Sequence, residues 1–138
     1  MYKKYNYLCA DARKIREDVF MKEQGFYNEF DEIDNYATHL VFYEDEYPMA
    51  VCRYYKGERE KEYMIGRVAI DKSYRGKKFG KWILEAAEEN IRQEGGEIIS
   101  LSAQIRVQLF YEKMGYVAFG EPYLDEFCLH IHMEKRIV

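Results

Sequence analysis

Residues 65–84 read IGRVAIDKSYRGKKFGKWIL, and this stretch decides the fold of the chain. Its first six residues are mostly apolar, several of them β-branched, which is typical of a strand. Residues 71–78 are polar and contain a glycine, and from Phe79 onward apolar residues recur at helical spacing. The stretch therefore predicts a strand, a short polar loop and the beginning of a long helix.

The predicted loop has the properties of an anion-binding site. The first turn of a helix offers unpaired backbone N–H groups and the positive end of the helix dipole, and glycines allow the backbone to approach a ligand closely. The loop and the first helical turn carry four cations, Arg75, Lys77, Lys78 and Lys81. The spacing matches neither Gly-x-x-x-x-Gly-Lys-Ser/Thr nor Gly-x-Gly-x-x-Gly. A pyrophosphate group suits this pattern, and a solvated basic turn is the alternative.

The elements on either side predict a mixed α/β fold. Before the loop we expect a strand at 5–9, a helix from Asp11 to before Gly25, an irregular segment or short helix at 26–35, and strands at 39–43, 49–55 and 62–70, with a turn at Tyr47-Pro48. After it we expect a helix that stops at Gly95-Gly96, strands at 98–101 and 116–120, a short helix at 107–114 and a final alternating strand at 127–134. The first three long strands form an antiparallel meander, and the long helix is a crossover between two parallel strands.

Composition limits the class of protein. The chain has 138 residues, 48% of them hydrophobic and 33% charged, and we expect one folded domain over residues 1–138. Lys and Arg total 21 against 25 Asp and Glu, a net charge of −4, which disfavours a dedicated nucleic-acid binder. No apolar run reaches the roughly 18 residues that span a bilayer, and the first residues lack the apolar stretch of a signal peptide.

The cysteines favour a reducing compartment. Cys9, Cys52 and Cys128 are odd in number and show no Cys-x-x-Cys spacing, so neither a disulfide framework nor a zinc ribbon is expected. His130 and His132 form a His-x-His pair, but no third ligand of matching context accompanies them, and we predict no metal cofactor. We expect a cytoplasmic protein.

Three ordered motifs give the chain a family resemblance. Residues 65–70 (IGRVAI), 74–80 (YRGKKFG) and 109–116 (LFYEKMGY) resemble the GNAT superfamily of acyl-CoA-dependent N-acyltransferases. The runs VFMKEQG at 19–25, EFDEID at 29–34 and THLV at 38–41 are similar to its ElaA-like branch, as are SAQ at 102–104 and HI at 130–131. The resemblance implies a mostly antiparallel central sheet of six to seven strands, flanked by helices and splayed between its two parallel middle strands.

The resemblance also implies a coenzyme site. The backbone of Val68, Ala69 and Ile70 is expected to pair with the pantetheine of acetyl-CoA, and Gln104 to contact it. The loop is expected to hold the pyrophosphate, through residues Arg75, Gly76, Lys77, Lys78, Phe79, Gly80 and Lys81. The family signature Arg-x-x-Gly-x-Gly is matched at Arg75 and Gly80, whereas Lys78 replaces the middle glycine. If that position requires a positive φ, lysine costs about 1 kcal/mol relative to glycine; alternatively its ammonium contacts a phosphate.

Transfer of an acetyl group from a thioester to an amine requires an oxyanion donor and a proton for the departing thiolate. A backbone N–H near Val68 or Ala69 is a candidate donor. Tyr111 matches the family tyrosine that acts as general acid, and the alternative is a core aromatic on the same helical face as Val107 and Met114. His39 is a candidate base, directly or through water, because a neutral imidazole has a pKa near 6.5.

Seven acids lie between Glu17 and Asp34, with Lys22 as the one cation. In the family this segment borders the acceptor pocket, so Glu29 and Asp31 are candidates for binding a cationic amine, with His130 nearby in the same cleft. A solvated acidic face is the other interpretation.

Two functions remain open from the sequence. The first is acetyl-CoA-dependent N-acetylation of a small-molecule or peptide amine. The second is a non-catalytic acyl-CoA-binding module, which the loss of the loop glycine at Lys78 favours and the presence of Tyr111 opposes. A homodimer is compatible with either function.

Overall fold

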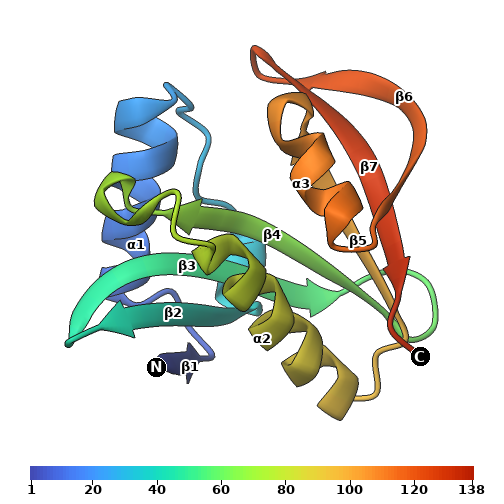
Figure 1. Cartoon of the computed structure of the whole chain (residues 1–138), viewed down its shortest axis with the longest axis horizontal. Helices are drawn as coiled ribbons and strands as arrows, with labels where there is room; N and C mark the ends of the chain where they lie inside the picture. Colours follow the sequence, from blue (N-terminus) through green and yellow to red (C-terminus); the bar gives the residue numbers. More distant parts are fainter. The chain divides into compact units, whose positions relative to one another are not determined.

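Seven strands form one mixed sheet in the computed structural model, which describes residues 1–138 (Figure 1). The strand order is β1-β2-β3-β4-β5-β7-β6, and β4 and β5 are the parallel pair in an otherwise antiparallel sheet. The helix that follows β4 is the crossover between this pair. The predicted fold class, including the meander and the crossover helix, is therefore confirmed.

The helices and strands alternate along the chain much as the hydrophobic periodicity predicts. The strands are β1 (Tyr2–Tyr5), β2 (Thr38–Glu44), β3 (Tyr47–Lys56), β4 (Glu62–Ile70), β5 (Ile98–Gln104), β6 (Val117–Asp125) and β7 (Cys128–Arg136). The α-helices are α1 (Ala10–Arg16), α2 (Phe79–Gln93) and α3 (Gln108–Lys113). The π-helix η1 (Glu17–Glu23) continues α1, and three short 3₁₀ turns complete the set: η2 (Glu32–Asn35), η3 (Lys72–Tyr74) and η4 (Ile105–Val107). No helix combines the length and the apolar character that crossing a bilayer requires.

The chain divides into two compact units. Unit 1 comprises Met1–Tyr55 and Ile65–Ala87, and unit 2 comprises Lys56–Met64 and Glu88–Val138. Both β4 and α2 contribute residues to each unit.

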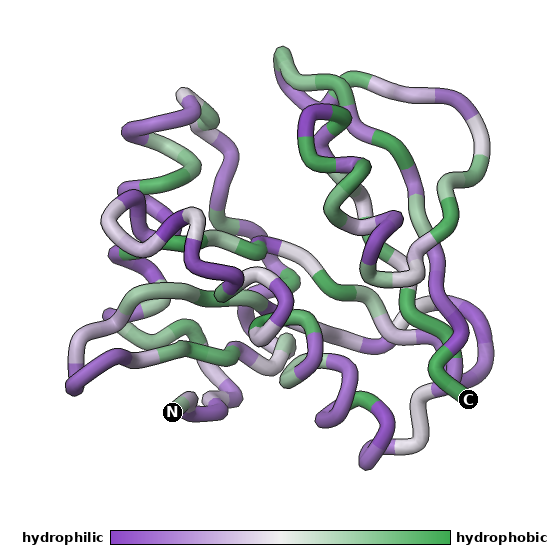
Figure 2. Tube along the Cα trace, viewed as in Figure 1, coloured by the Kyte–Doolittle hydropathy of each residue, from purple (hydrophilic) through white to green (hydrophobic).

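In unit 1, helices cover both faces of β2. The Phe42 ring packs against Trp82 of α2, with 5.0 Å between ring centroids, whereas the hydroxyl of the adjacent Tyr43 donates to Asp11 of α1 at 2.9 Å. Figure 1 shows α2 in front of β3 and α1 behind it, so the two helices lie on opposite faces of the sheet in unit 1. The middles of β2 and β3 are buried on both faces and mostly hydrophobic (Figure 2).

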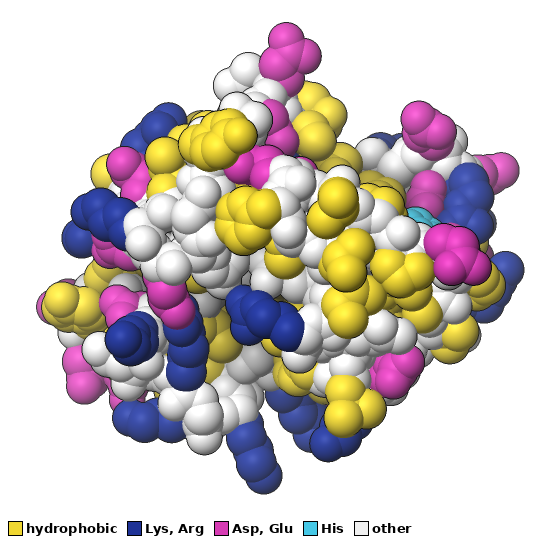
Figure 3. Space-filling model, turned by 90° about the horizontal axis from the view of Figure 1, so that it is seen from above, with side chains coloured by type: hydrophobic (Ala, Val, Ile, Leu, Met, Phe, Trp, Pro, Cys, Tyr) yellow, Lys and Arg dark blue, Asp and Glu magenta, His cyan; other side chains and the backbone are white.

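In unit 2, β7 pairs antiparallel with both β5 and β6. One face of β5 and β7 is buried and apolar, with Leu101 opposite Met133 and Ala103 opposite Ile131. The β6–β7 hairpin is different, because it exposes several large apolar side chains, Phe119, Leu124, Phe127 and Leu129. Hydrophobic side chains are prominent at this surface in Figure 3.

Two local predictions were wrong. The first strand lies at Tyr2–Tyr5 rather than 5–9, where it pairs with β2. The first helix ends before Gly25 as predicted, but its second half, Glu17–Glu23, is a π-helix, which periodicity does not reveal. The turn before β3 consists of Asp45 and Glu46, both with positive φ, and Pro48 instead lies within the strand, opposite Tyr43.

Candidate active site

The loop between β4 and α2 begins with a local cap. The Asp71 carboxylate accepts a hydrogen bond from the Ser73 backbone N–H at 3.1 Å and so starts the 3₁₀ turn η3. Two left-handed residues follow, Gly76 at φ +81° and Lys78 at φ +64°, and α2 begins at Phe79. The left-handed residues turn the chain sharply into the helix, so the loop lies directly before the first-turn N–H groups.

The loop is open and positively charged. Gly76, Lys77, Lys78 and Lys81 are exposed, and a Cβ placed on Gly76 meets no atom within 4 Å. The helix that follows has 15 residues and carries no acid in its first turn. Exposed ammonium groups beside a long helix's N-terminus favour a phosphate or pyrophosphate ligand, so these residues fit the diphosphate of coenzyme A.

Lys78 occupies a position that favours glycine. A left-handed conformation costs a residue with a Cβ roughly 1–2 kcal/mol, whereas glycine adds about 0.4–1 kcal/mol of unfolded-state entropy. We therefore expect Lys78→Gly to raise the free energy of unfolding by about 0.5–1 kcal/mol in urea denaturation. Lys77→Gly is the matched control, because Lys77 has a negative φ and should lose stability. An equal loss in both variants contradicts the expected strain at Lys78.

The Arg75 side chain connects the loop to β4 and to η1. Its Nε donates to the Ile70 carbonyl at 3.0 Å, and its Nη2 donates to Glu23 Oε1 of η1 at 2.6 Å. Its Nη1 pairs with the other oxygen of the same carboxylate. The guanidinium is thus engaged by β4 and the π-helix, and we assign Arg75 to holding the loop in place rather than to direct phosphate contact.

The backbone of β4 is distorted just before the predicted pantetheine-binding residues. Arg67 has a φ of +53° in the interior of the strand, a conformation that costs about 1–3 kcal/mol in a non-glycine residue. A left-handed residue within a strand is typical of a β-bulge, which interrupts the regular alternation of N–H groups. Val68 and Ala69 follow it directly, so their N–H groups lie at the distortion.

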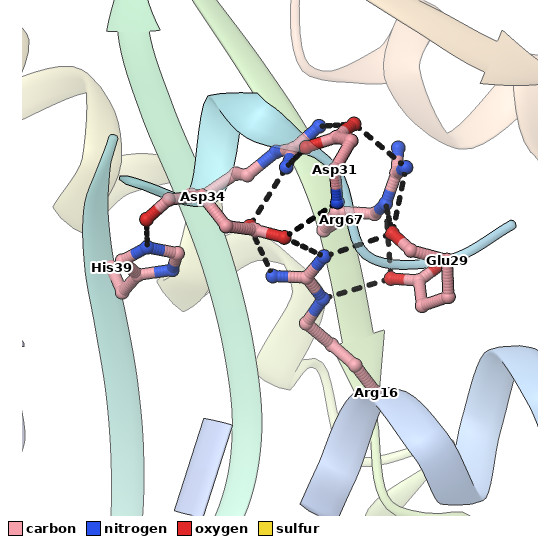
Figure 4. A network of polar contacts seen from close by, with 7 residues as sticks. Arg16, Glu29, Asp31, Asp34, His39 and Arg67 are labelled. Atoms are coloured by element: carbon pink, nitrogen blue, oxygen red, sulfur yellow. Dashed lines mark hydrogen bonds and ion pairs between the residues drawn. The ribbon is translucent and has the colours of Figure 1, made fainter. Parts of the chain in front are cut away.

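A buried ionic cluster surrounds this part of unit 1 (Figure 4). We call it the arginine–carboxylate cluster, and its members are Arg16, Glu29, Asp31, Asp34, Arg53 and Arg67. Arg16 is fully buried and donates to Glu29 Oε2 at 2.8 Å and to both Asp34 oxygens at 2.7 and 3.1 Å. Arg53 bridges Asp31 and Asp34 at 2.7 and 2.8 Å. Each buried carboxylate is therefore paired with at least one guanidinium.

The cluster sets the protonation of its acids. Burial alone raises the pKa of Asp34, but the hydrogen bond and charge of Arg16 outweigh burial and hold that pKa well below its ordinary value. The same balance, with Arg53 as the partner, lowers the pKa of Asp31. For Glu29, burial outweighs Arg67 and Arg16, and the pKa is raised.

The cluster corrects the expected role of Glu29 and Asp31. Glu29 is 4% exposed and shared by Arg16 and Arg67, and Asp31 is paired with Arg53 and Arg67. Their charges are already compensated by arginines, so they do not form the free acidic rim that a cationic amine requires. The acidic run is instead half of an internal salt-bridge network.

His39 does not meet the requirements of a surface base. Its side chain is fully buried, its Nε2 lies 3.1 Å from the Asp34 carbonyl, and its Nδ1 is buried without a partner. Burial, more than any other factor, lowers its pKa below the ordinary value. In this position His39 supports the η2 turn, and we do not assign it to proton transfer.

This burial makes stability depend on pH. Because the pKa of His39 is lower in the folded state, the unfolded state binds more protons below about pH 6.5, and stability falls as pH decreases. One proton corresponds to at most about 1.4 kcal/mol per pH unit. We expect urea unfolding between pH 7.5 and 5.5 to show this loss, and His39→Gln to flatten the slope. The raised pKa of Glu29 changes the dependence of stability on pH in the opposite direction, and it does so equally in the wild type and in His39→Gln. The difference between the two slopes of stability against pH therefore reports on His39 alone. Identical slopes contradict the expectation.

Tyr111 is positioned by α3 in unit 2. Its side chain is 8% exposed and lies edge-on to Phe110 and Tyr116, at centroid distances of 5.1 and 5.9 Å. Its carbonyl accepts from the N–H of Tyr116 at 3.0 Å, which closes the end of α3. The ring is thus held rigidly. A positioned proton donor requires such rigidity, and an aromatic residue of the core has it as well.

Gln104 and His130 face each other in unit 2. They are register partners at the adjoining ends of β5 and β7. The Gln104 side-chain oxygen accepts from Arg106 at 3.0 Å. His130 is 6% exposed, its Nδ1 lies 3.0 Å from the Cys128 carbonyl, and its ring stacks on Tyr123. These two predicted residues therefore lie together, while Glu29, Asp31 and His39 gather in unit 1.

The three arginines of the cluster, Arg16, Arg53 and Arg67, were not among the residues predicted from the sequence. Arg16 carried a detectable signal, because it falls on the helical stripe of Ala12, Ile15 and Val19, all of which are buried. An arginine in an apolar stripe indicates a buried partner of opposite charge. Arg53 and Arg67 carried no comparable signal within their strands.

Comparison with known proteins identifies relatives over nearly the whole chain. A family model described as an acetyltransferase (GNAT) domain matches residues 10–137. The uncharacterised N-acetyltransferase YjcF of Bacillus subtilis is 33% identical over 128 residues, covering 91% of this chain and 90% of the relative. A crystal structure of an acyl-CoA N-acyltransferase from Pseudomonas aeruginosa has a TM-score of 0.85 at 27% identity, covering 98% and 99% of the two chains. Escherichia coli ElaA has a TM-score of 0.84 at 24% identity over 98% of each chain, a similarity of fold.

Proposed function

The chain belongs to the GNAT acetyltransferase family, and from this membership we propose that it transfers an acetyl group from acetyl-CoA to a primary amine. The observation that carries the proposal is the geometry of unit 1. A strand distorted at Arg67, whose φ is +53°, leads into a basic loop with two left-handed residues at the start of α2. The strand offers backbone groups to the pantetheine, and the loop offers donors to the diphosphate.

Different residues of the loop and of β4 are proposed to bind different parts of the coenzyme. Backbone N–H groups from Gly76 to Gly80 hold the diphosphate, and the ammonium groups of Lys77, Lys78 and Lys81 compensate its charge. Val68, Ala69 and Ile70 pair with the pantetheine as an additional strand does. As the family resemblance implies, Gln104 is assigned to the pantetheine amides.

In the chemical step, the neutral amine attacks the thioester carbonyl carbon, the C–S bond breaks as the amide forms, and the attacking nitrogen releases one proton to water. The N–H of Val68 or Ala69 stabilises the developing oxyanion. Tyr111 donates a hydrogen bond or its proton to the departing thiolate. A thiol pKa near 8.5 and a phenol pKa near 10 make complete transfer uphill by about 2 kcal/mol, so a strong hydrogen bond is sufficient.

Acetyl-CoA titration and thiol release test this function together. We expect calorimetry to show binding of acetyl-CoA, and a panel of polyamines, amino sugars, amino acids and peptides to contain an acceptor that releases free CoA thiol. Binding without thiol release from any acceptor supports the alternative, a non-catalytic acyl-CoA-binding module. Absence of acetyl-CoA binding contradicts both functions.

The thiols support a reducing, cytoplasmic setting for this activity. Cys9, Cys52 and Cys128 are all free, and Cys9 and Cys52 are buried. Burial raises the pKa of Cys52 to about 12, so this thiol stays protonated and unreactive.

A further inference from the structure

Arg67 differs from every other left-handed non-glycine residue of the chain. Asp45, Glu46, Lys61, Lys78 and Glu126 lie in turns and loops, where positive φ values are common. Arg67 lies inside β4, where the regular extended conformation is available to it. A strained residue in this place persists only if its surroundings hold it.

The side chain of Arg67 provides that hold. Its Nε and Nη2 donate to the Glu29 carbonyl at 3.2 and 3.0 Å, and its Nε also lies 2.9 Å from Glu29 Oε2. Its Nη2 lies 3.4 Å from Asp31 Oδ2. The guanidinium is thus anchored to one backbone carbonyl and two carboxylates of the segment that leads into β2 (Figure 4).

The anchor itself is rigid. Arg16, fully buried, donates to the same Glu29 carbonyl at 3.1 Å and to the same carboxylate oxygen at 2.8 Å. Glu29 is therefore fixed by two guanidinium groups, one from α1 and one from β4. Asp31 is fixed by Arg53 at 2.7 and 3.1 Å. Because its partners Glu29 and Asp31 are themselves held in place, the Arg67 side chain restrains the backbone of Arg67.

The conformation of Arg67 determines where the next peptide groups point. In a regular strand successive N–H groups alternate between the two edges, and a left-handed residue interrupts that alternation. The peptide that joins Arg67 to Val68 is the first one affected, and the Val68 and Ala69 N–H groups are the proposed oxyanion donors. We propose that Arg67 is a positioning residue, whose contacts with Glu29 and Asp31 hold β4 in the bulged conformation that directs these N–H groups at the thioester carbonyl. The inference rests on the proposed function.

The experiment compares Arg67→Ala, Arg67→Gly and Arg67→Lys. Glycine adopts a positive φ without strain and lacks the side chain, whereas alanine lacks the side chain and relaxes toward the extended conformation. Lysine retains the charge but not the planar, multidentate guanidinium. We expect kcat to fall at least 30-fold in the alanine and lysine variants and less than 10-fold in the glycine variant. In the alanine and lysine variants the fold-loss of kcat should exceed the fold-loss of affinity for CoA, which lacks the thioester carbonyl, by at least 10-fold.

Two measurements separate positioning from a general loss of structure. Crystal structures without ligand should show residue 67 at positive φ in the glycine variant and at negative φ in the alanine variant. In ¹⁵N spectra of the wild type, the Val68 or Ala69 amide should shift more with acetyl-CoA than with CoA, and this difference should disappear in Arg67→Ala.

The outcomes distinguish the two levels of the proposal. Equal kcat values for the alanine and glycine variants, or a positive φ retained in Arg67→Ala, overturn the positioning role while leaving the proposed function in place. A wild-type protein that binds acetyl-CoA but acetylates no amine overturns the catalytic function, and the positioning role with it.

Discussion

We expect Tyr111→Phe to lower kcat about 100-fold while the affinity for acetyl-CoA changes less than 3-fold. The substitution removes one hydroxyl and leaves the ring, whose contacts with Phe110 and Tyr116 position α3. Loss of a positioned proton donor typically costs 10²–10⁴-fold in rate. We expect the lower end of this range of rate losses, because Tyr111 is proposed to give the thiolate a hydrogen bond and not a complete proton transfer. Steady-state kinetics by thiol detection, together with calorimetric titration of acetyl-CoA, measure the two quantities separately.

Tyr63→Phe is the matched control for this prediction. Tyr63 is also buried in unit 2, at 7% exposure, and its hydroxyl makes a long 3.4 Å contact with the Glu94 carbonyl. We expect its kcat to remain at the wild-type level. A Tyr111→Phe variant with unchanged kcat assigns Tyr111 to the core alone, and an equal rate loss in both variants assigns the effect to packing.

The second large effect is on stability. Arg16→Met should lower the free energy of unfolding by about 3–5 kcal/mol, because it removes one of the two guanidinium partners from each of the buried carboxylates Glu29 and Asp34. Small domains are stable by only about 5–15 kcal/mol, so the variant loses a large part of its stability. Urea denaturation followed by far-UV circular dichroism measures the change. Methionine keeps the apolar stem of the side chain, so the loss reports on the ionic contacts.

Arg13→Met provides the comparison on the same helix. Arg13 is exposed, one turn before Arg16, and its guanidinium lies 4.4 Å from the Phe30 ring centroid. We expect this change to cost less than about 1 kcal/mol. Similar losses at both positions, or a loss below about 1 kcal/mol at Arg16, show that the cluster contributes little net stability.

Several elements followed from local sequence. The Glu62–Ile70 strand and the start of α2 at Phe79 were predicted at the observed residues, because a mostly apolar run with β-branched residues is followed by a polar loop and then by helical spacing. The turn into β3 was misplaced, because Pro48 is a common turn residue and yet also occurs at the beginning of a strand. Neither Asp45 nor Glu46 is a glycine, so the sequence contains no signal of their left-handed conformations.

The candidate site was predictable only in part. The basic loop before α2 was recognised, since glycine, lysine and a helix N-terminus are adjacent in the sequence. The acidic run from Glu17 to Asp34 has the composition of a solvated face or a cation site. Its true partners, Arg53 and Arg67, are distant along the chain and belong to different strands. No local pattern links them.

By itself, the sequence determined the order of strands and helices, the mixed sheet with its crossover helix, and the basic, glycine-containing loop at the start of α2. These properties depend on periodicity and on neighbours within a few residues, which a single chain displays directly. Only the tertiary structure decided that Glu29 and Asp31 are paired with arginines, that His39 is buried, and that Arg67 has a left-handed conformation inside β4. Those properties depend on which side chains the folded chain brings into contact, and a charge that becomes buried requires a partner of opposite sign.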